Sequence, residues 1–331
     1  MDVPRSLLAA VACFGFAAPL AQAQDVDPEA VAAEMARAKG PAKPWKHVRG
    51  FGRVLDLRNP PVVIDEPGLY AIDRNWDLAE SANGSAGLIQ ITAEGVTLDL
   101  HGFDISADPG QGTLLVITGF AEVRNGGISA CCTDGAVAVH TARSASLHHL
   151  SLFSHDTMTF DDGMSITDSD LGVRVEMQFG SFSQLLRNTI TCNRGGRCVS
   201  FLGESNTMTD NTLTLFQGGG VYIAGDRNVA ANNVIDARNA VDHLEVFEIA
   251  GDRNVVRSNT FFMGGFDQAP LWLITGTQNT LDGNIAAGGR ARIGMEFTAD
   301  GNYYGNNRMA AEVPFALGGT VQADWGGNVG Y

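Results

Sequence analysis

One short phrase recurs through the second half of the chain and constrains its fold more than any other feature. In each copy two asparagines stand five residues apart, and a pair of apolar residues precedes them. The copies span residues 206–211, 228–233, 254–259, 279–284 and, more loosely, 302–307. The second asparagines of successive copies are separated by 22, 26, 25 and 23 residues. A period in the twenties built from Asn, Gly and β-branched residues is typical of a stacked solenoid.

The apolar residues of each copy alternate with polar ones. Val221 and Ile223 flank Tyr222, and the next copy repeats this pattern around Glu248. In a strand, such an apolar pair faces one side. A single copy cannot bury that side alone, whereas stacked copies share a continuous interior with strands about 4.8 Å apart. No copy has room for a ten-residue helix between its turns. The pattern therefore predicts an all-β, single-stranded parallel β-helix.

The second asparagine of each copy is expected at one corner of the coil. This column consists of Asn188, Asn211, Asn233, Asn259, Asn284 and Asn307. Asn tolerates left-handed backbone angles, and its side-chain amide can bond the same group one coil away. Less regular copies in the first half have corners at His101-Gly102, Asn125-Gly126, Leu150 and Asp168. Together the copies predict about ten coils and a rod of roughly 50 Å.

Composition excludes several other classes of protein. A chain of 331 residues with 44% hydrophobic content is not disordered, and it has ample core without a second domain. Its net charge of −15 argues against a nucleic-acid partner, because phosphate binding needs clustered Lys and Arg. Lysine is confined to Lys39, Lys43 and Lys46, all before the repeats.

The N-terminal region predicts export. Residues 1–23 have the features of a signal peptide: Arg5, an apolar run over 7–20, and Ala21 and Ala23 around a cleavage site. The apolar run is too short for a transmembrane segment, so we expect a periplasmic or secreted protein. Residues 24–65 are expected to form an N-terminal cap and an extended segment. The cap would be a short helix that has Asp27 as its N-cap residue and continues over 30–37. Residues 66–331 would then form the β-helix domain.

Four cysteines remain after the expected cleavage. An oxidising compartment permits disulfides, and Cys192 and Cys198 flank a loop that a bridge could close, so we expect this pair to be bonded. Cys131 and Cys132 are adjacent in the sequence. No spacing of Cys and His resembles that of a zinc site.

Several of these features resemble one known superfamily. The phrase Gly95-Val-Thr-Leu-Asp-Leu-His-Gly102, the Ile-x-Gly-x-x-Asn units and the secretory start are similar to the right-handed parallel β-helix superfamily, the pectate-lyase-like fold. The resemblance covers about residues 88–307 and implies right-handed coils. Members include polysaccharide lyases, uronan C5-epimerases and glycoside hydrolases, alongside tailspikes and adhesins. The fold alone does not choose among these activities.

Motifs of the catalytic members narrow the choice. Polygalacturonase-type hydrolases would show Asn-Thr-Asp, Asp-Asp, Gly-His-Gly and Arg-Ile-Lys, and only Asp161-Asp162 matches. Alginate lyases that use a Lys base are excluded because every coil lacks Lys. Uronan epimerases carry Asp-Pro-His-Asp with a nearby Arg, and Ser154-His155-Asp156 keeps only the His-Asp part of that motif.

Alternation along the predicted strands places polar side chains on one outward face. They are His140, His155, Arg174, Glu176, Ser200, Tyr222 and Glu248. The first four belong to three consecutive coils, so we expect them within about 10 Å of each other. Abstracting a proton α to a uronate carboxylate needs a base such as His and a cation that holds the carboxylate as charge builds.

These requirements give each residue a predicted role. His155 or His140 is the expected base, Arg174 the carboxylate clamp, and Glu176 a group that orients the histidine. Asp156, Tyr222 and Glu248 are the expected substrate-binding residues. The competing interpretation is that all of them are ordinary solvated strand residues.

A column of carboxylates follows the outward strands, at Glu204, Asp226, Asp252 and Asp300. Stacked carboxylates repel, so a Ca²⁺ ion could bridge Asp226 and Asp252. The other interpretation is a set of turn residues, with Arg227 and Arg253 as neighbours.

The sequence thus predicts an exported protein that acts on an anionic polysaccharide. The expected activity is that of a lyase or C5-epimerase of uronic-acid-containing glycans. The alternative is a non-catalytic envelope scaffold or a glycan-binding β-helix module.

Overall fold

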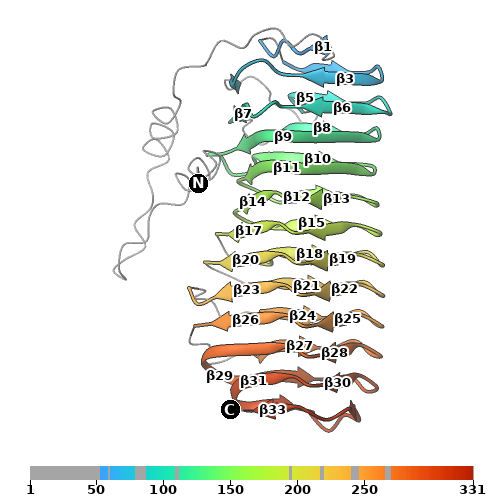
Figure 1. Cartoon of the computed structure of the whole chain (residues 1–331), viewed down its shortest axis with the longest axis vertical. Coiled ribbons are helices and arrows are strands. Elements are labelled where there is room, and N and C mark those ends of the chain that lie inside the picture. The colour runs from blue at the N-terminus through green and yellow to red at the C-terminus, as the bar shows by residue number, and fades with distance from the viewer. Residues whose placement is uncertain are drawn as a thin grey trace.

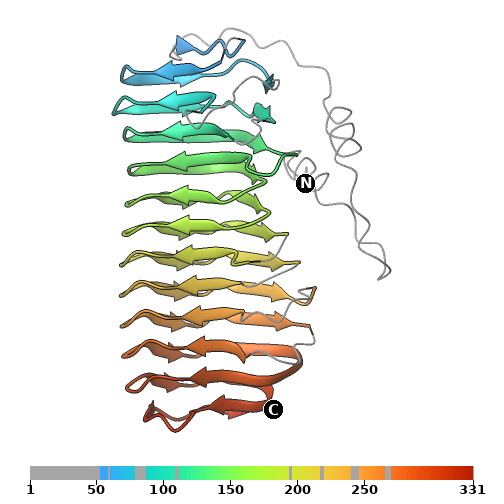
Figure 2. The same ribbon diagram turned by 180° about the vertical axis from the view of Figure 1, so that it is seen from behind.

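A computed structural model describes residues 53–58, 60–78, 87–108, 112–193, 196–216, 220–239, 246–264 and 270–330. These residues form a column of stacked β coils and contain no helix (Figures 1 and 2). The predicted all-β parallel solenoid is therefore confirmed. The expected signal peptide over 1–23 and the expected helix over 30–37 lie outside the described residues. No described segment is a helix with the length and hydrophobicity to span a bilayer.

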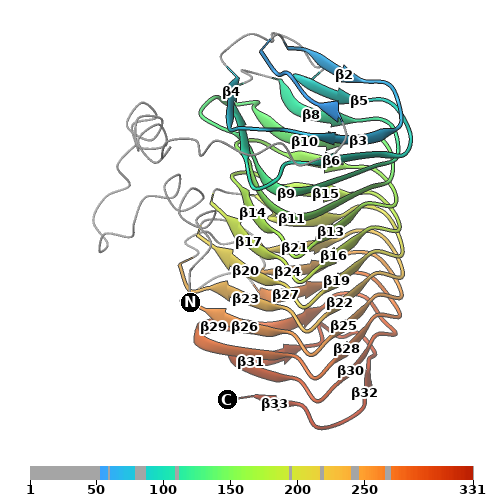
Figure 3. The ribbon, with the colours of Figure 1, turned by 45° about the horizontal axis from the view of Figure 1, so that its top comes forward.

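The coils wind through three parallel sheets, here named A, B and C (Figure 3). Sheet A contains β2 (Val62–Ile64), β5 (Ile89–Ile91), β8 (Thr113–Ile117), β10 (Val137–Thr141), β12 (Met158–Phe160), β15 (Met177–Phe179), β18 (Val199–Phe201), β21 (Val221–Ile223), β24 (Phe247–Ile249) and β27 (Pro270–Ile274). Sheet B contains β1 (Arg53–Val54), β3 (Gly68–Ala71), β6 (Val96–Asp99), β13 (Ser165–Thr167), β16 (Gln184–Leu186), β19 (Thr207–Thr209), β22 (Val229–Ala231), β25 (Val255–Arg257), β28 (Thr280–Asp282), β30 (Tyr303–Gly305) and β32 (Ala323–Asp324). Sheet C contains β4 (Trp76–Leu78), β7 (Asp104–Ala107), β14 (Asp170–Val173), β17 (Thr189–Cys192), β20 (Thr212–Leu215), β23 (Val234–Ala237), β26 (Thr260–Met263) and β33 (Val329–Gly330).

Four longer strands bend from one sheet into the next. β9 (Ala121–Ala130) and β11 (Ala145–Ser154) run from sheet B into sheet C, and β29 (Ile285–Phe297) and β31 (Arg308–Ala316) run from sheet C into sheet A. At the other end of the solenoid, β1 pairs with β3 and β2 pairs with β5. The paired sheets therefore begin before residue 66, the boundary expected from the sequence, and extend the stack beyond the coils that the repeats predict.

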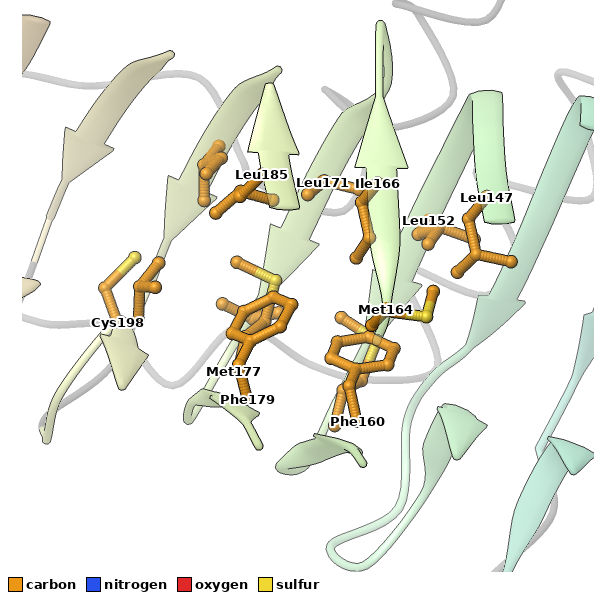
Figure 4. Close-up of a cluster of buried hydrophobic side chains, with 14 of the residues drawn as sticks. Leu147, Leu152, Phe160, Met164, Ile166, Leu171, Met177, Phe179, Leu185 and Cys198 are labelled. Carbon is orange, nitrogen blue, oxygen red and sulfur yellow. The ribbon is translucent and has the colours of Figure 1, made fainter. Parts of the chain in front are cut away.

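Alternate side chains from all three sheets point into one shared interior (Figure 4). In sheet A the rings of Phe160, Phe179 and Phe201 stack on one another, with centroids 5.0 and 5.4 Å apart. Farther along, Phe247 stacks on Trp272 at 5.0 Å. Burial of one such side chain stabilises the fold by about 1.5–3 kcal/mol. The core is thus a set of columns in which each coil covers the apolar groups of the coil before it.

The asparagine column is a buried hydrogen-bond ladder, as the sequence predicts. Both the backbone N and the Nδ2 of Asn211 donate to Oδ1 of Asn233, each at 3.0 Å. Asn233 donates in the same way to Asn259, with both distances 2.9 Å. Ladder bonds of this kind satisfy polar groups that no water reaches.

The left-handed residue at this corner is not the asparagine itself, contrary to the sequence-based expectation. It is the residue just before it, for example Asp210 with φ 58° and Ser258 with φ 54°. The asparagine points inward to make the ladder, so its exposed predecessor reverses the chain. A second buried ladder, which the sequence interpretation did not assign, joins Asn206, Asn228, Asn254, Asn279 and Asn302.

Coil length varies most at one of the three bends. From β9 onward the step from sheet B to sheet C is five residues, as from Ile166 to Leu171, and the step from sheet A to sheet B is six or seven. The step from sheet C to sheet A is eight residues from Leu171 to Phe179 but fourteen from Ile235 to Ile249. Extra residues therefore gather at the C-to-A turn, where the candidate site lies.

Replacement of a ladder asparagine should destabilise the fold far more than replacement of its neighbour. Asn233→Ala removes the acceptor of two buried donors of Asn211, each of which costs about 1–3 kcal/mol when unsatisfied, so we expect a loss of roughly 2–4 kcal/mol in the free energy of unfolding. Asn232→Gly is the matched control, because Asn232 is exposed with φ 55° and should change stability by less than about 0.5 kcal/mol. Urea unfolding followed by circular dichroism measures both. Equal effects would contradict the ladder's structural role.

Candidate functional site

The outward face of sheet A carries one polar column. In register from coil to coil it consists of His140, Thr159, Gln178, Ser200, Tyr222 and Glu248. The predicted outward positions of His140, Tyr222 and Glu248 thus share one face. His155 and Arg174 do not belong to this column, because β12 and β15 begin three residues after them. The sequence-based alignment had placed both residues in the strands.

The second half of this polar face is held together by side-chain contacts. Glu176 accepts hydrogen bonds from the Ser200 hydroxyl and, at 2.8 Å, from Nε2 of Gln178. The guanidinium of Arg197 lies over the Tyr222 ring at 3.2 Å from its centroid and donates to Oε2 of Glu248 at 2.8 Å. Glu176 is therefore engaged with sheet A rather than with a histidine. Arg197 is a cation that the sequence interpretation missed, because it treated this stretch only as a disulfide-closed loop.

His155 and Arg174 occupy the turn that leads from sheet C to sheet A. Backbone hydrogen bonds continue the sheet C register by one residue into this turn. The His155 N donates to the Ala130 carbonyl at 3.1 Å, and the Arg174 N donates to the Ser154 carbonyl at 3.1 Å. His155 and Arg174 are therefore neighbours in adjacent coils, on the same edge of the solenoid.

The two side chains meet directly. Nη1 of Arg174 lies 3.3 Å from Nδ1 of His155 and also contacts Nε2. Oδ1 of Asp134 lies 3.6 Å from the imidazole Nδ1 and 3.4 Å from the guanidinium. An arginine N–H can only donate, so an imidazole nitrogen that accepts from it carries no proton. The His155 side chain is 11% exposed and that of Arg174 is 29% exposed, so the pair sits at the surface with the imidazole partly covered.

This environment favours neutral His155. Burial lowers the pKa of the imidazole, and the positive charge of Arg174 lowers it further. The carboxylate of Asp134 opposes both effects. A neutral imidazole beside a fixed guanidinium is the combination that proton abstraction next to a carboxylate requires.

The structure separates the other predicted residues from this pair. His140 is aligned with Thr159 on sheet A, because the residues that follow them, Thr141 and Phe160, are paired. His155 lies four residues before Thr159 in the chain, so the two imidazoles do not form one site. Asp156 follows His155, and its Oδ1 accepts a hydrogen bond from the Thr157 N at 2.7 Å. That contact makes it a turn residue.

A surface hollow of about 560 Å³ lies at the opposite edge of sheet A from the His155–Arg174 pair. Thr159 and Gln178 form part of its lining, together with Phe120, which is 57% exposed, and Leu202, which is 50% exposed. Carboxylates of Asp161 and Asp162 complete one side. The hollow was not predicted from the sequence, since its walls come from six different coils.

The carboxylate column has partners of its own. Oδ1 of Asp226 accepts from the Asp252 N at 2.8 Å, and Oδ1 of Asp252 accepts from the Thr277 N at 2.6 Å. Glu204 is paired with Arg227. In the described part of the chain no three His, Cys, Asp or Glu side chains converge as a metal site would need. These contacts match the turn interpretation of Asp226 and Asp252.

A polar network on sheet B was also not predicted. Arg124 bonds Asp99 and Glu122, both at 2.9 Å, and Nε2 of His148 lies 2.7 Å from Glu122. Each charge in this network faces an opposite one, which describes a satisfied ion-pair network on a strand face. It leaves the His155–Arg174 pair as the best candidate for chemistry.

Comparison with known families settles the fold class. A family model described as a right handed beta helix region matches residues 118–286, just over half of the chain. The chain belongs to the right-handed β-helix family. No curated protein and no solved structure matches it. The matched region contains His155, Arg174 and the polar column of sheet A. Membership of the family does not determine an activity, which has to be argued from the chemistry of these groups.

Removal of the Arg174 charge should raise the pKa of His155. In Arg174→Gln the imidazolium loses a repulsive neighbour, so the proton binds more readily. Imidazole chemical shifts followed by NMR against pH measure this change. His140→Gln identifies the signal of the sheet A imidazole and should leave the His155 titration in place. A His155 titration that stays unchanged in Arg174→Gln would show that the two groups are not in contact.

The same lowered pKa predicts a pH dependence of stability. The unfolded chain binds a proton at His155 more readily than the folded chain does, so the free energy of unfolding should fall as the pH drops below about 6.5. The Arg174→Gln variant should lose part of this dependence, because its folded-state pKa lies nearer the ordinary value. Urea unfolding between pH 5 and 8 compares the two proteins.

Proposed function

We propose that this protein is exported and acts on a uronic-acid-containing polysaccharide, as a lyase or a C5-epimerase. The observation that carries the proposal is the contact between the neutral imidazole of His155 and the guanidinium of Arg174. Export rests on the signal-like sequence over residues 1–23. The polar column of sheet A, which follows this turn in the chain, would bind the extended polymer beside this pair.

In the proposed reaction the uronate carboxylate draws the Arg174 guanidinium away from His155, and the freed imidazole nitrogen removes the proton α to that carboxylate. Arg174 binds the carboxylate and stabilises the negative charge that passes onto its oxygens. The electron pair then has two fates. It expels the sugar oxygen attached at C4, which takes a proton from water and leaves a C4–C5 double bond, or it takes up a proton from water at C5 on the opposite face, which inverts that carbon.

Sheet A offers groups that could hold the rest of the polymer. Tyr222 presents an aromatic ring under Arg197, and Glu248 presents a hydrogen-bonding group along the same column. Arg197 adds a second positive charge at the outer face, which suits a neighbouring carboxylate of the same chain.

Substitution of His155 should remove the chemistry without removing the fold. We expect His155→Ala to lower kcat/KM by about 10²–10⁴-fold, the usual contribution of a general base. Arg174→Gln should lower it by about 10²–10³-fold, because one stabilising cation is lost. His140→Ala is the matched control and should stay within a few-fold of the unmodified protein. Ultraviolet absorbance of the unsaturated product reports lysis, and deuterium uptake at C5 in D₂O reports epimerisation.

The test needs a panel of polyuronates that differ in linkage and configuration. No unsaturated product and no deuterium uptake with any of them would contradict the proposal. Equal losses in His155→Ala and His140→Ala would also contradict it, because the assigned base would then have no special role.

The hollow at the other edge of sheet A favours a second candidate function, a non-catalytic glycan-binding module of the cell envelope. Exposed Phe120 and Leu202 are apolar surfaces on which a sugar ring can pack, and Asp161 and Asp162 can accept bonds from hydroxyl groups. If this is the function, Phe120→Ala should weaken glycan binding by at least about tenfold, whereas His155→Ala should leave it unchanged. Isothermal titration with glycan fragments distinguishes the two.

A further inference from the structure

We propose that the bond between Cys131 and Cys132 is a positioning element for His155 and Arg174. It holds the turn that carries Asp134 against both side chains, so that reduction of this one disulfide alters the site. The inference rests on the function proposed above and adds its dependence on redox state.

The disulfide is next to His155 in the stack. Ala130 pairs with Ser154, and Ser154 pairs with Val173. The residues that follow these three are Cys131, His155 and Arg174, and backbone bonds continue the register through each of them. Cys131, bonded to Cys132, therefore occupies the coil directly beside that of His155.

The turn over residues 130–136 is tied to the site at both ends. Ala130 accepts the hydrogen bond from the His155 N at 3.1 Å, and Ala136 accepts one from the Asp156 N at 3.0 Å. Between them, the Thr133 hydroxyl donates to Asp108 at 2.8 Å. A change in this turn is thus transmitted to the peptide that carries the imidazole.

Within the turn, the cross-link restrains a backbone shape that cysteine otherwise avoids. Cys132 has φ 83°, a left-handed angle that L-residues with a β-carbon seldom adopt. A bond between adjacent side chains closes a small ring through their shared peptide and limits the angles of both residues. When the bond is absent, the turn is free to relax.

Asp134 depends on the shape of this turn. Its side chain is 93% exposed, so packing does not fix it. Its carboxylate nevertheless lies 3.6 Å from His155 and 3.4 Å from Arg174. The backbone of the turn therefore sets the distance between this negative charge and the pair.

The vicinal bond is also the more accessible of the two disulfides. Cys131 and Cys132 are half-buried, whereas Cys192 and Cys198, which form the other disulfide, are buried. A dithiol reductant would break the more accessible Cys131–Cys132 bond first. Two electrons from the dithiol and two protons give two cysteine thiols, and the reductant becomes a disulfide.

The test follows the His155 imidazole of the full chain by NMR against pH, before and after mild dithiothreitol treatment. Mass spectrometry of the alkylated protein verifies that Cys131 and Cys132 are reduced while Cys192 and Cys198 stay bonded. Displacement of the Asp134 charge weakens the opposition to burial and Arg174, to which Asp156 and Asp108 also contribute, so the pKa of His155 should shift downward on reduction. Asp134→Asn should reproduce this shift without any reductant. In Cys131→Ser/Cys132→Ser, dithiothreitol should cause no further change.

A His155 titration that stays the same or moves upward, with Cys131 and Cys132 shown to be reduced, overturns the inference. Asp134→Asn keeps the test decisive if the double serine variant does not fold.

Activity measurements distinguish failure of this inference from failure of the proposed function. Equal turnover in oxidised and reduced protein refutes the positioning role and leaves the activity standing. A redox-dependent imidazole in a protein that turns over no polyuronate refutes the activity and leaves the positioning role standing.

Discussion

The structure depends on hydrogen bonding between equivalent residues of neighbouring coils. Each strand between the two ends of the stack pairs in parallel with the strand one coil before and one coil after it, so its residues have fixed partners along the stack. This register carries the aromatic columns of the core and the two asparagine ladders. It also decides which polar side chains meet, because residues far apart in the sequence become neighbours about 4.8 Å apart. The contact between His155 and Arg174 is a direct product of that register.

The regular part of the chain could be predicted from the sequence because its physical cause is local. Alternation around Tyr222 and Glu248 fixes the strand faces, and an asparagine every 22–26 residues fixes the corners. The same reasoning could not identify which residue at the corner adopts left-handed backbone angles. Asp210 and its equivalents vary in type, since an exposed residue next to a buried ladder is under little selection by packing.

The candidate site was only partly predictable, for a physical reason. The coils that carry His155 and Arg174 have Leu150 and Asp168 at the predicted corners instead of asparagine, and the corner spacing falls to about twenty residues, so the strand register had to be extrapolated. The extrapolation brought His155 and Arg174 onto one flank but placed them in strands instead of the preceding turn. Asp134 and Arg197 were missed because their positions depend on how turns fold over neighbouring coils. Alternation carries no information about such turns.

The variable length of the C-to-A turn bears on how such a protein can change. Extra residues gather mainly between sheet C and sheet A, while from β9 onward the B-to-C corner keeps its length. The solenoid thus joins a nearly constant frame to one widely adjustable rim. Segments could be lengthened or exchanged along that rim without disturbing the stack behind it. New specificity can arise there while the frame goes on folding as before.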